Sequence, residues 1–256
     1  MNTFKNKQPD IRLTYKTIEG TDLPIDVYFP EGSIANAKTV IAIHGGGWTG
    51  AMTADTKWEG GWMGNTAKYF AEKGFISIAF SYRSLNVSEK MHVGDILEDC
   101  TDALRFIYKH FNFVDKENVV YIGDSAGGYI TTMLGISDDD LLRPKITVSC
   151  NPVLDTSREK WAYGFKGVNA SEYSPLEKEI KNASEFIFLH GTSDEIVEIE
   201  DTEKLHNILL EKGHKSTFVK IPDAQHAFIL FDYKYEDSYV CEITDKIIEL
   251  IRAKGI

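Results

Sequence analysis

Residues 119–128 read Val-Val-Tyr-Ile-Gly-Asp-Ser-Ala-Gly-Gly. An apolar run ends at Gly123, and a helical pattern begins at Ala126. Ser125 therefore lies at a predicted sharp turn from a strand into a helix, where glycines two residues away on either side leave room for a strained backbone. Such a turn lifts a hydroxyl above the sheet, and the new helix directs its N–H groups toward any anion that forms there. The stretch predicts a nucleophilic serine in an α/β protein.

Apolar runs and helical patterns alternate along the rest of the chain. Runs typical of strands buried on both faces are Thr39–His44, Phe75–Tyr82, Asn118–Ile122, Lys145–Cys150, Glu185–Leu189 and Ser216–Ile221. The predicted helices are Asn65–Lys73, Asp95–His110, Ala126–Gly135, Glu200–Lys212 and Tyr239–Ala253. Residues Ile11–Ile18 and Ile25–Phe29 alternate between polar and apolar side chains, which predicts antiparallel edge strands. The alternation predicts a mostly parallel central sheet with helices on both faces.

One segment interrupts this alternation, at residues 155–184. It mixes four aromatic side chains with charges and one proline, and it is too long for a plain connection in a compact domain. We predict a small cap over the active site there, with a packed surface excursion as the equal alternative. Because no Pro/Gly/Ser-rich linker divides the chain, we predict a single domain over residues 1–256.

Charge and composition argue against several classes of function. Lys and Arg number 28 against 39 Asp and Glu, and the formal charge of -11 disfavours nucleic acid and anionic membranes as partners. The chain has no run near the ~20 apolar residues of a membrane span. Its first ten residues lack an apolar signal core, so a cytoplasmic location is expected. Three cysteines without paired spacing are poor material for disulfides or a zinc site.

A second motif follows the first long apolar run, where residues 44–48 read His-Gly-Gly-Gly-Trp. Consecutive glycines allow main-chain N–H groups to point into a site without interference from side chains. Such groups stabilise a carbonyl oxygen as it becomes an oxyanion. We expect the N–H groups of Gly46 and Gly47 to act there together with that of Ala126, while His44 orders the loop.

The same loop also fits the dinucleotide-binding pattern Gly-x-Gly-x-x-Gly, at Gly45, Gly47 and Gly50. That fold places an acidic residue at the end of the next strand to hold a ribose. Here the next apolar run leads into Arg83, and three more glycines within residues 51–64 are a poor start for a packed helix. We therefore disfavour a nucleotide site.

The base that activates the serine is expected to be one of seven histidines. His226 follows the last predicted strand and precedes the closing helix. Ligands of open α/β sheets bind beyond the carboxyl ends of the strands, which is where this histidine falls. The other six have simpler interpretations; His190, for example, ends a strand.

A carboxylate must hold that imidazole in the correct tautomer and stabilise the imidazolium. Asp194 lies on the loop after the predicted strand Glu185–Leu189. Its neighbour Glu195 is one alternative, and Asp155, which follows the preceding strand, is another. With Asp194, the chain order is serine, acid, histidine, which is the order that a nucleophile-elbow hydrolase requires.

Tryptophans gather in regions that we place near the mouth of the site. Trp48, Trp58, Trp62 and Trp161 would stack on sugar rings or an aryl acid if exposed, and they would equally serve as core. We predict Trp48 and Trp161 as substrate contacts, together with Asp124 beside the nucleophile.

In combination, these motifs resemble the hormone-sensitive-lipase-like and acetylesterase group of α/β hydrolases, over residues 39–228. The His-Gly-Gly-Gly-Trp form is also similar to small bacterial feruloyl and acetylxylan esterases and to kynurenine formamidases. The resemblance implies the α/β-hydrolase fold and a catalytic triad of Ser125, Asp194 and His226.

The resemblance further implies an oxyanion hole built from Gly46, Gly47 and Ala126, with the N–H of Trp48 as an alternative donor. It implies hydrolysis of short-chain acyl esters, acetyl or similar, on a carbohydrate or aryl group. The reaction would pass through an acyl-enzyme and need neither metal nor cofactor. The expected partner is a small-molecule ester, bound by a monomer or homodimer.

Three alternatives share the fold. An amidase of the kynurenine-formamidase type would use the same triad on an N-formyl substrate. A serine peptidase is disfavoured, because peptidases of this fold usually carry a large additional domain. A non-catalytic ligand receptor often lacks one member of the triad, whereas all three residue types are present here.

Overall fold

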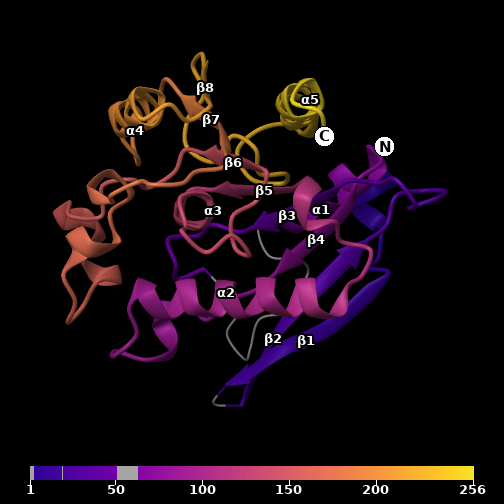
Figure 1. The fold of residues 1–256 in the computed structure, drawn as a ribbon, viewed down its shortest axis with the longest axis horizontal. Coiled ribbons are helices and arrows are strands. Elements are labelled where there is room, and N and C mark those ends of the chain that lie inside the picture. Colours follow the sequence, from indigo (N-terminus) through magenta and orange to yellow (C-terminus); the bar gives the residue numbers. More distant parts are fainter. Residues whose placement is uncertain (1–2, 19, 51–62) are drawn as a thin grey trace.

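The structure is a computed structural model that describes residues 3–18, 20–50 and 63–256. Its centre is one eight-stranded sheet in the order β1-β2-β4-β3-β5-β6-β7-β8 (Figure 1). The strands are β1 (Ile11–Ile18), β2 (Thr21–Tyr28), β3 (Thr39–Ile43), β4 (Ile76–Phe80), β5 (Val119–Asp124), β6 (Ile146–Cys150), β7 (Glu185–Gly191) and β8 (Ser216–Ile221). The pairs β1–β2 and β2–β4 are antiparallel, and the other five pairs are parallel. The predicted mostly parallel sheet with antiparallel strands at one edge is confirmed.

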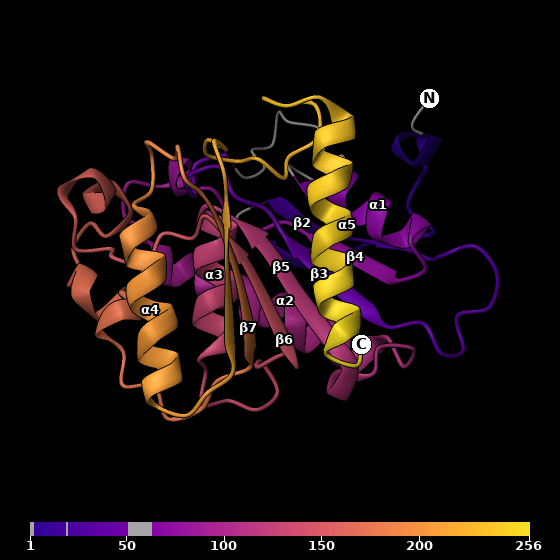
Figure 2. The same cartoon turned by 90° about the horizontal axis from the view of Figure 1, so that it is seen from above.

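Helices cover both faces of this sheet (Figure 2). On one face, α1 (Gly64–Glu72) and α5 (Asp237–Ala253) pack into a single apolar cluster. On the other, α2 (Val93–His110) and α3 (Ala126–Gly135) share a second cluster, and α4 (Ile199–Glu211) contributes to a third. The arrangement is the predicted one, and each predicted helix begins and ends within a few residues of the observed one.

Strand β3 shows why its sequence is apolar without interruption. Val40 and Ala42 pack on the side of α1 and α5, while Ile41 and Ile43 pack on the side of α2 and α3. Successive side chains of a strand point to opposite faces, so a strand covered on both sides buries every residue. All four side chains are buried.

Four strand ends bring the predicted site together. The parallel strands β3, β5, β7 and β8 end at the same edge of the sheet, so the loops that follow them converge there. These loops carry the glycine-rich motif, Ser125, Asp194 and His226.

Residues 155–184 form three short 3-10 helices, η5 (Glu159–Gly164), η6 (Ala170–Tyr173) and η7 (Pro175–Glu177). The segment is anchored to the body, because Trp161 and Phe165 join the apolar cluster shared by α2 and α3. Arg158 also makes a two-point ion pair with Asp201 of α4, at 2.7 and 3.1 Å. The role of this segment as a cap stays a prediction.

Candidate active site

Ser125 stands at the turn between β5 and α3 with a φ of 56°. Non-glycine residues rarely adopt this backbone conformation, and its cost is met by the surrounding structure. A Cβ on Gly123 would lie 2.3 Å from the carbonyl oxygen of Gly127, and a Cβ on Gly127 would lie 2.1 Å from that of Ile43. Only glycine fits at these two positions, which explains the spacing in the sequence.

His226 reaches this serine from the loop after β8. Its Nε2 lies 2.8 Å from Oγ of Ser125, and its Nδ1 lies 2.8 Å from Oδ2 of Asp194. A carboxylate only accepts hydrogen bonds, so Nδ1 carries the proton and Nε2 is left to accept from the serine hydroxyl. The structure thus brings the three residues into one hydrogen-bonded chain with the geometry of an activated nucleophile.

Asp194 is held from several sides. Its Oδ1 accepts hydrogen bonds from the N–H groups of Ile196 and Val197, at 2.9 and 3.0 Å. Its side chain is fully buried. Burial alone raises the pKa of this carboxyl, but hydrogen bonds from His190, His226 and the N–H of Val197 outweigh burial and hold the pKa well below its usual value. The acid therefore stays ionised beside the imidazole.

The two alternative acids lie elsewhere. Glu195 is exposed to solvent. The carboxylate of Asp155 accepts hydrogen bonds from Ser157 and lies 3.5 Å from Nε of Arg158. In the described part of the chain, Asp194 is the carboxylate that contacts His226.

The glycine-rich loop lies directly against the nucleophile. A Cβ on Gly45 would lie 2.5 Å from the carbonyl oxygen of Asp124 and 3.2 Å from Cβ of Ser125. His44 orders the loop, since its Nδ1 donates to the carbonyl of Gly45 at 3.0 Å and its ring stacks on Tyr82. Burial lowers the pKa of His44 to about 4, against the opposing effect of its hydrogen bond to Gly45, so this imidazole is neutral near pH 7.

The predicted oxyanion donors occupy the same corner. Gly46, Gly47 and Trp48 have positive φ values of 94°, 61° and 59°. Ala126 is the first residue of α3, where N–H groups have no carbonyl from a preceding turn. These positions suit donors to a developing anion, and their role stays a prediction.

The tryptophan prediction needs correction. The indole of Trp48 is 0% exposed and packs edge-on against Tyr129, Trp161 and Phe165, with ring centroids 5.4 to 5.9 Å apart. Trp161 is also buried. Neither ring is an exposed platform for substrate, because both fill the apolar space beneath the glycine-rich loop. Trp58 and Trp62 lie outside the described residues.

Asp124 is likewise corrected as a substrate contact. Its side chain is buried, and its Oδ1 accepts a hydrogen bond from Nδ2 of Asn151 at 2.6 Å. Burial raises the pKa of Asp124 from 3.8 to about 7, against the opposing effects of His226 and the Asn151 hydrogen bond. The carboxyl lies in the interior because neighbouring residues at the end of a strand point to opposite sides.

Sequence reasoning missed two residues of the site. His190 is fully buried, and its Nε2 lies 3.4 Å from Oδ2 of Asp194. Tyr163, in η5, is 39% exposed and donates its hydroxyl hydrogen to the carbonyl of Gly47 at 3.1 Å. His190 lies four residues before the acid, and this spacing is the only signal that the sequence offered.

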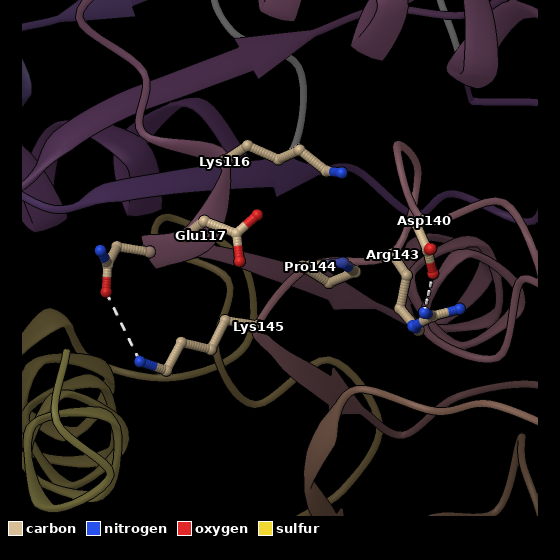
Figure 3. Close-up of a pocket in the computed structure, with 7 residues that line it drawn as sticks. Lys116, Glu117, Asp140, Arg143, Pro144 and Lys145 are labelled. Atoms are coloured by element: carbon tan, nitrogen blue, oxygen red, sulfur yellow. Dashed lines mark hydrogen bonds and ion pairs between the residues drawn. The ribbon is translucent and has the colours of Figure 1, made fainter.

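A separate hollow lies at the opposite end of the sheet, beside the amino ends of β5 and β6 (Figure 3). It is lined by Lys116, Glu117, Asn118, Asp140, Arg143, Pro144 and Lys145. This lining consists of charged and amide side chains and one proline, and it contains none of the candidate catalytic residues. Within residues 3–18, 20–50 and 63–256, no three His, Cys, Asp or Glu side chains gather as a metal site. Over the same ranges, no helix is long and apolar enough to cross a bilayer.

Comparison with solved structures supports the fold. Esterase 2 of Thermogutta terrifontis phosphonylated by cyclosarin superimposes with a TM-score of 0.80, covering 96% of this chain and 94% of that one at 23% identity. The same esterase with propionate bound also gives a TM-score of 0.80, at 22% identity and the same coverage.

Two longer curated proteins are similar in sequence. A probable dipeptidyl-peptidase 5 of Aspergillus terreus is 25% identical over 85% of this chain and 32% of its own length. Endo-1,4-beta-xylanase B of Butyrivibrio fibrisolvens is 29% identical over 63% of this chain and 28% of its own. The chain thus spans about a third of the length of these relatives.

A family model identifies the family to which the chain belongs. The model named BD-FAE matches residues 25–162, more than half of the chain. The match includes the glycine-rich loop and the serine turn, and the fold agrees with it. The chain belongs to the BD-FAE family and has the α/β-hydrolase fold.

Proposed function

We propose that the protein is a serine carboxylic-ester hydrolase that acts on short-chain acyl esters through an acyl-enzyme. The observation that carries this proposal is the hydrogen-bonded chain from Ser125 through His226 to Asp194, with 2.8 Å at each step. The serine lies beneath a glycine-rich loop and at the start of a helix, where a carbonyl oxygen can be stabilised as it gains charge.

The first half of the proposed reaction acylates the enzyme. Oγ of Ser125 attacks the ester carbonyl carbon while Nε2 of His226 takes the hydroxyl proton, which leaves an imidazolium facing Asp194. The carbonyl oxygen becomes an oxyanion, and main-chain N–H groups stabilise it by roughly 3 kcal/mol each. When the carbon–oxygen bond to the alcohol breaks, Nε2 returns the proton to the departing oxygen and the acyl group stays on the serine.

The second half frees the acyl group. A water molecule attacks the acyl carbon and gives a proton to Nε2 of His226. The tetrahedral intermediate then collapses, the bond between the acyl carbon and Oγ of Ser125 breaks, and the imidazolium returns its proton to Oγ. The products are a carboxylic acid and an alcohol, and the side chains return to their starting state.

The proposed substrate class draws on the relatives and on one exposed ring. The Thermogutta terrifontis esterase has been solved with propionate and with butyrate, and we propose acyl groups of similar size here. One curated relative is a xylanase. The exposed ring of Tyr163 beside the glycine-rich loop would contact a sugar or aryl group on either side of the ester.

A peptidase is the second candidate, favoured by the similarity to dipeptidyl-peptidase 5 over 85% of the chain. The same side chains would then transfer an acyl group from an amide nitrogen, with His226 protonating the departing amine. Turnover of dipeptide nitroanilides would indicate a peptidase, and turnover of N-formyl amides would indicate a formamidase. Neither assay detects ester hydrolysis.

The test is a substrate panel with matched variants. Wild type is assayed on para-nitrophenyl acetate, propionate, butyrate and octanoate, on acetylated xylo-oligosaccharides, and on the amides above. We expect the short esters to be turned over fastest. Ser125→Ala should lower kcat by at least ~10⁴-fold, whereas Ser193→Ala, at an exposed serine on the acid loop, should retain it. Ester turnover that survives Ser125→Ala overturns the proposal.

A further inference from the structure

His190 lies directly behind the acid of the proposed triad, near the carboxyl end of β7. It is 0% exposed, and both of its ring nitrogens have partners. Nδ1 lies 2.8 Å from Oγ1 of Thr202 on α4, and Nε2 lies 3.1 Å from the carbonyl oxygen of Val197. Nε2 also lies 3.4 Å from Oδ2 of Asp194. The mechanism described above gives this buried imidazole no task.

The partners fix where the ring carries its hydrogen. The carbonyl oxygen of Val197 and the carboxylate of Asp194 only accept, so Nε2 must be an N–H group that donates to Val197 and lies 3.4 Å from Oδ2 of Asp194. Thr202 is fully buried, and its hydroxyl fixes the other side of the ring. The ring is therefore oriented from α4 and presents a donor to the acid loop.

The two oxygens of Asp194 are held by different means. Oδ1 accepts from the main-chain N–H groups of Ile196 and Val197, which belong to the same turn as the aspartate. Oδ2, the oxygen that faces His226, has His190 as its other neighbour. The N–H groups on Oδ1 do not contact Oδ2. A donor on strand β7 is therefore placed to restrain Oδ2 on the side where the imidazolium forms.

We infer that His190 is a positioning residue for the proposed ester hydrolysis: its Nε2–H holds Oδ2 of Asp194 in register with Nδ1 of His226. The inference rests on the proposed function of the triad. His190 supplies one N–H contact to the acid, and Thr202 of α4 holds the ring in the orientation that this contact needs. No proton transfer by His190 is required.

The first test replaces the ring in two ways. His190→Leu fills similar space without a donor, whereas His190→Gln can place an amide N–H near the former Nε2. We expect His190→Leu to lower kcat on a short nitrophenyl ester by roughly 10- to 100-fold with little change in KM, as for one lost hydrogen bond to a charged group. His190→Gln should remain within roughly threefold of wild type, because the donor is retained.

The pH profile separates positioning from mere support of the fold. Without the His190 N–H, Oδ2 of Asp194 attracts the imidazolium proton of His226 more strongly. The acid limb of kcat/KM in His190→Leu should therefore move to higher pH, and it should return to the wild-type position in His190→Gln. A purely structural role would lower the melting temperature and leave kcat and the acid limb of folded protein unchanged.

Thr202→Val tests whether the contact between Thr202 and the ring of His190 matters. It also replaces His190→Leu as the test if that variant does not fold. It removes the hydroxyl that orients the ring, so we expect a smaller fall in kcat with the same direction of pH shift. Because both changes act through one contact, the double variant should be no slower than His190→Leu alone. The matched control is His206→Leu, which breaks another imidazole–hydroxyl pair, to Ser216 at 2.7 Å, away from the acid. It should leave kcat unchanged.

The rate at which a fluorophosphonate labels Ser125 measures activation of the serine without any ester substrate. It therefore tests the role of His190 independently of ester hydrolysis. If wild type reacts with the probe but hydrolyses no ester, the ester proposal fails and the labelling rates still decide the role of His190. A slower rate in His190→Leu, with His190→Gln and His206→Leu near wild type, supports positioning. Equal labelling rates and equal kcat in folded His190→Leu and Thr202→Val overturn it.

Discussion

The hydroxyl of Tyr163 donates a hydrogen bond to the carbonyl of Gly47, 3.1 Å away, and so ties residues 155–184 to the glycine-rich loop. Gly47 has a φ of 61°, and Trp48 after it has a φ of 59°. A loop in this conformation depends on outside contacts to keep its N–H groups aimed. The Tyr163 hydrogen bond links the segment predicted as a cap to the loop that carries the predicted oxyanion donors.

Tyr163→Phe removes this hydrogen bond and keeps the ring. We expect kcat on short esters to fall several-fold with KM nearly unchanged, because a neutral hydrogen bond contributes about 1 kcal/mol. Tyr163→Ala also removes the exposed ring and should raise KM, more for aryl and sugar esters than for simple alkyl esters. Steady-state kinetics on the two substrate types measure both effects. Equal KM values for all three proteins would exclude the ring as a substrate contact.

Gly45→Ala is predicted to inactivate the enzyme by displacing the glycine-rich loop. The new Cβ would lie 2.5 Å from the carbonyl oxygen of Asp124 and 3.2 Å from Cβ of Ser125, so the loop must move away from the nucleophile. Loss of aligned donors costs roughly 10²- to 10³-fold in kcat. Gly32→Ala is the control for backbone strain alone: Gly32 has a φ of 87° with nothing within 4 Å of its Cβ position, so this variant should lose stability and keep kcat. Full activity in Gly45→Ala would contradict the close packing of loop and serine.

The buried carboxyl of Asp124 predicts a pH-dependent stability. Burial raises its pKa from 3.8 to about 7, so unfolding releases its proton between these values. The contribution of this group to stability is therefore greatest below pH 3.8 and declines as the pH rises to about 7. Asp124→Asn keeps an acceptor for Asn151 and cannot ionise.

Urea unfolding of wild type and Asp124→Asn at pH 4.5 and pH 8 measures this effect. The variant should gain stability relative to wild type on going from pH 4.5 to pH 8, by at most about 3 kcal/mol. Asp194, whose pKa is lowered, contributes in the opposite sense, but it is present in both proteins and cancels in the difference. A difference that does not vary with pH would show that Asp124 ionises as readily as an exposed aspartate.

The sheet and the serine turn were predictable because their physical demands are local. A strand buried on both faces needs a continuous apolar run, as at Thr39–Ile43, and a strained turn needs small neighbours, as around Ser125. Asp194 and His226 were found from the rule that active loops follow the carboxyl ends of parallel strands. The structure brings His226 into contact with Ser125, and Asp194 into contact with His226.

Other features depend on contacts that the sequence does not encode locally. Because Trp48 follows three glycines, its sequence context suggests an aromatic ring on a surface loop. Its positive φ and its neighbours from η5 and α3 instead place the indole in the core. His190 ends a strand like many buried histidines, and its link to the acid appears only when β7 and α4 are packed. Asp124 lies next to the nucleophile, yet its side chain turns inward to Asn151.

Trapping the acyl-enzyme tests directly whether Ser125 is the nucleophile. Wild type is quenched with acid during turnover of para-nitrophenyl acetate, and its peptides are mapped by mass spectrometry. We expect one acetyl group on Ser125, absent from Ser125→Ala and, because His226 is needed for attack, greatly reduced in His226→Gln. An unmodified Ser125 during rapid turnover, or turnover at the wild-type rate in Ser125→Ala, would contradict it.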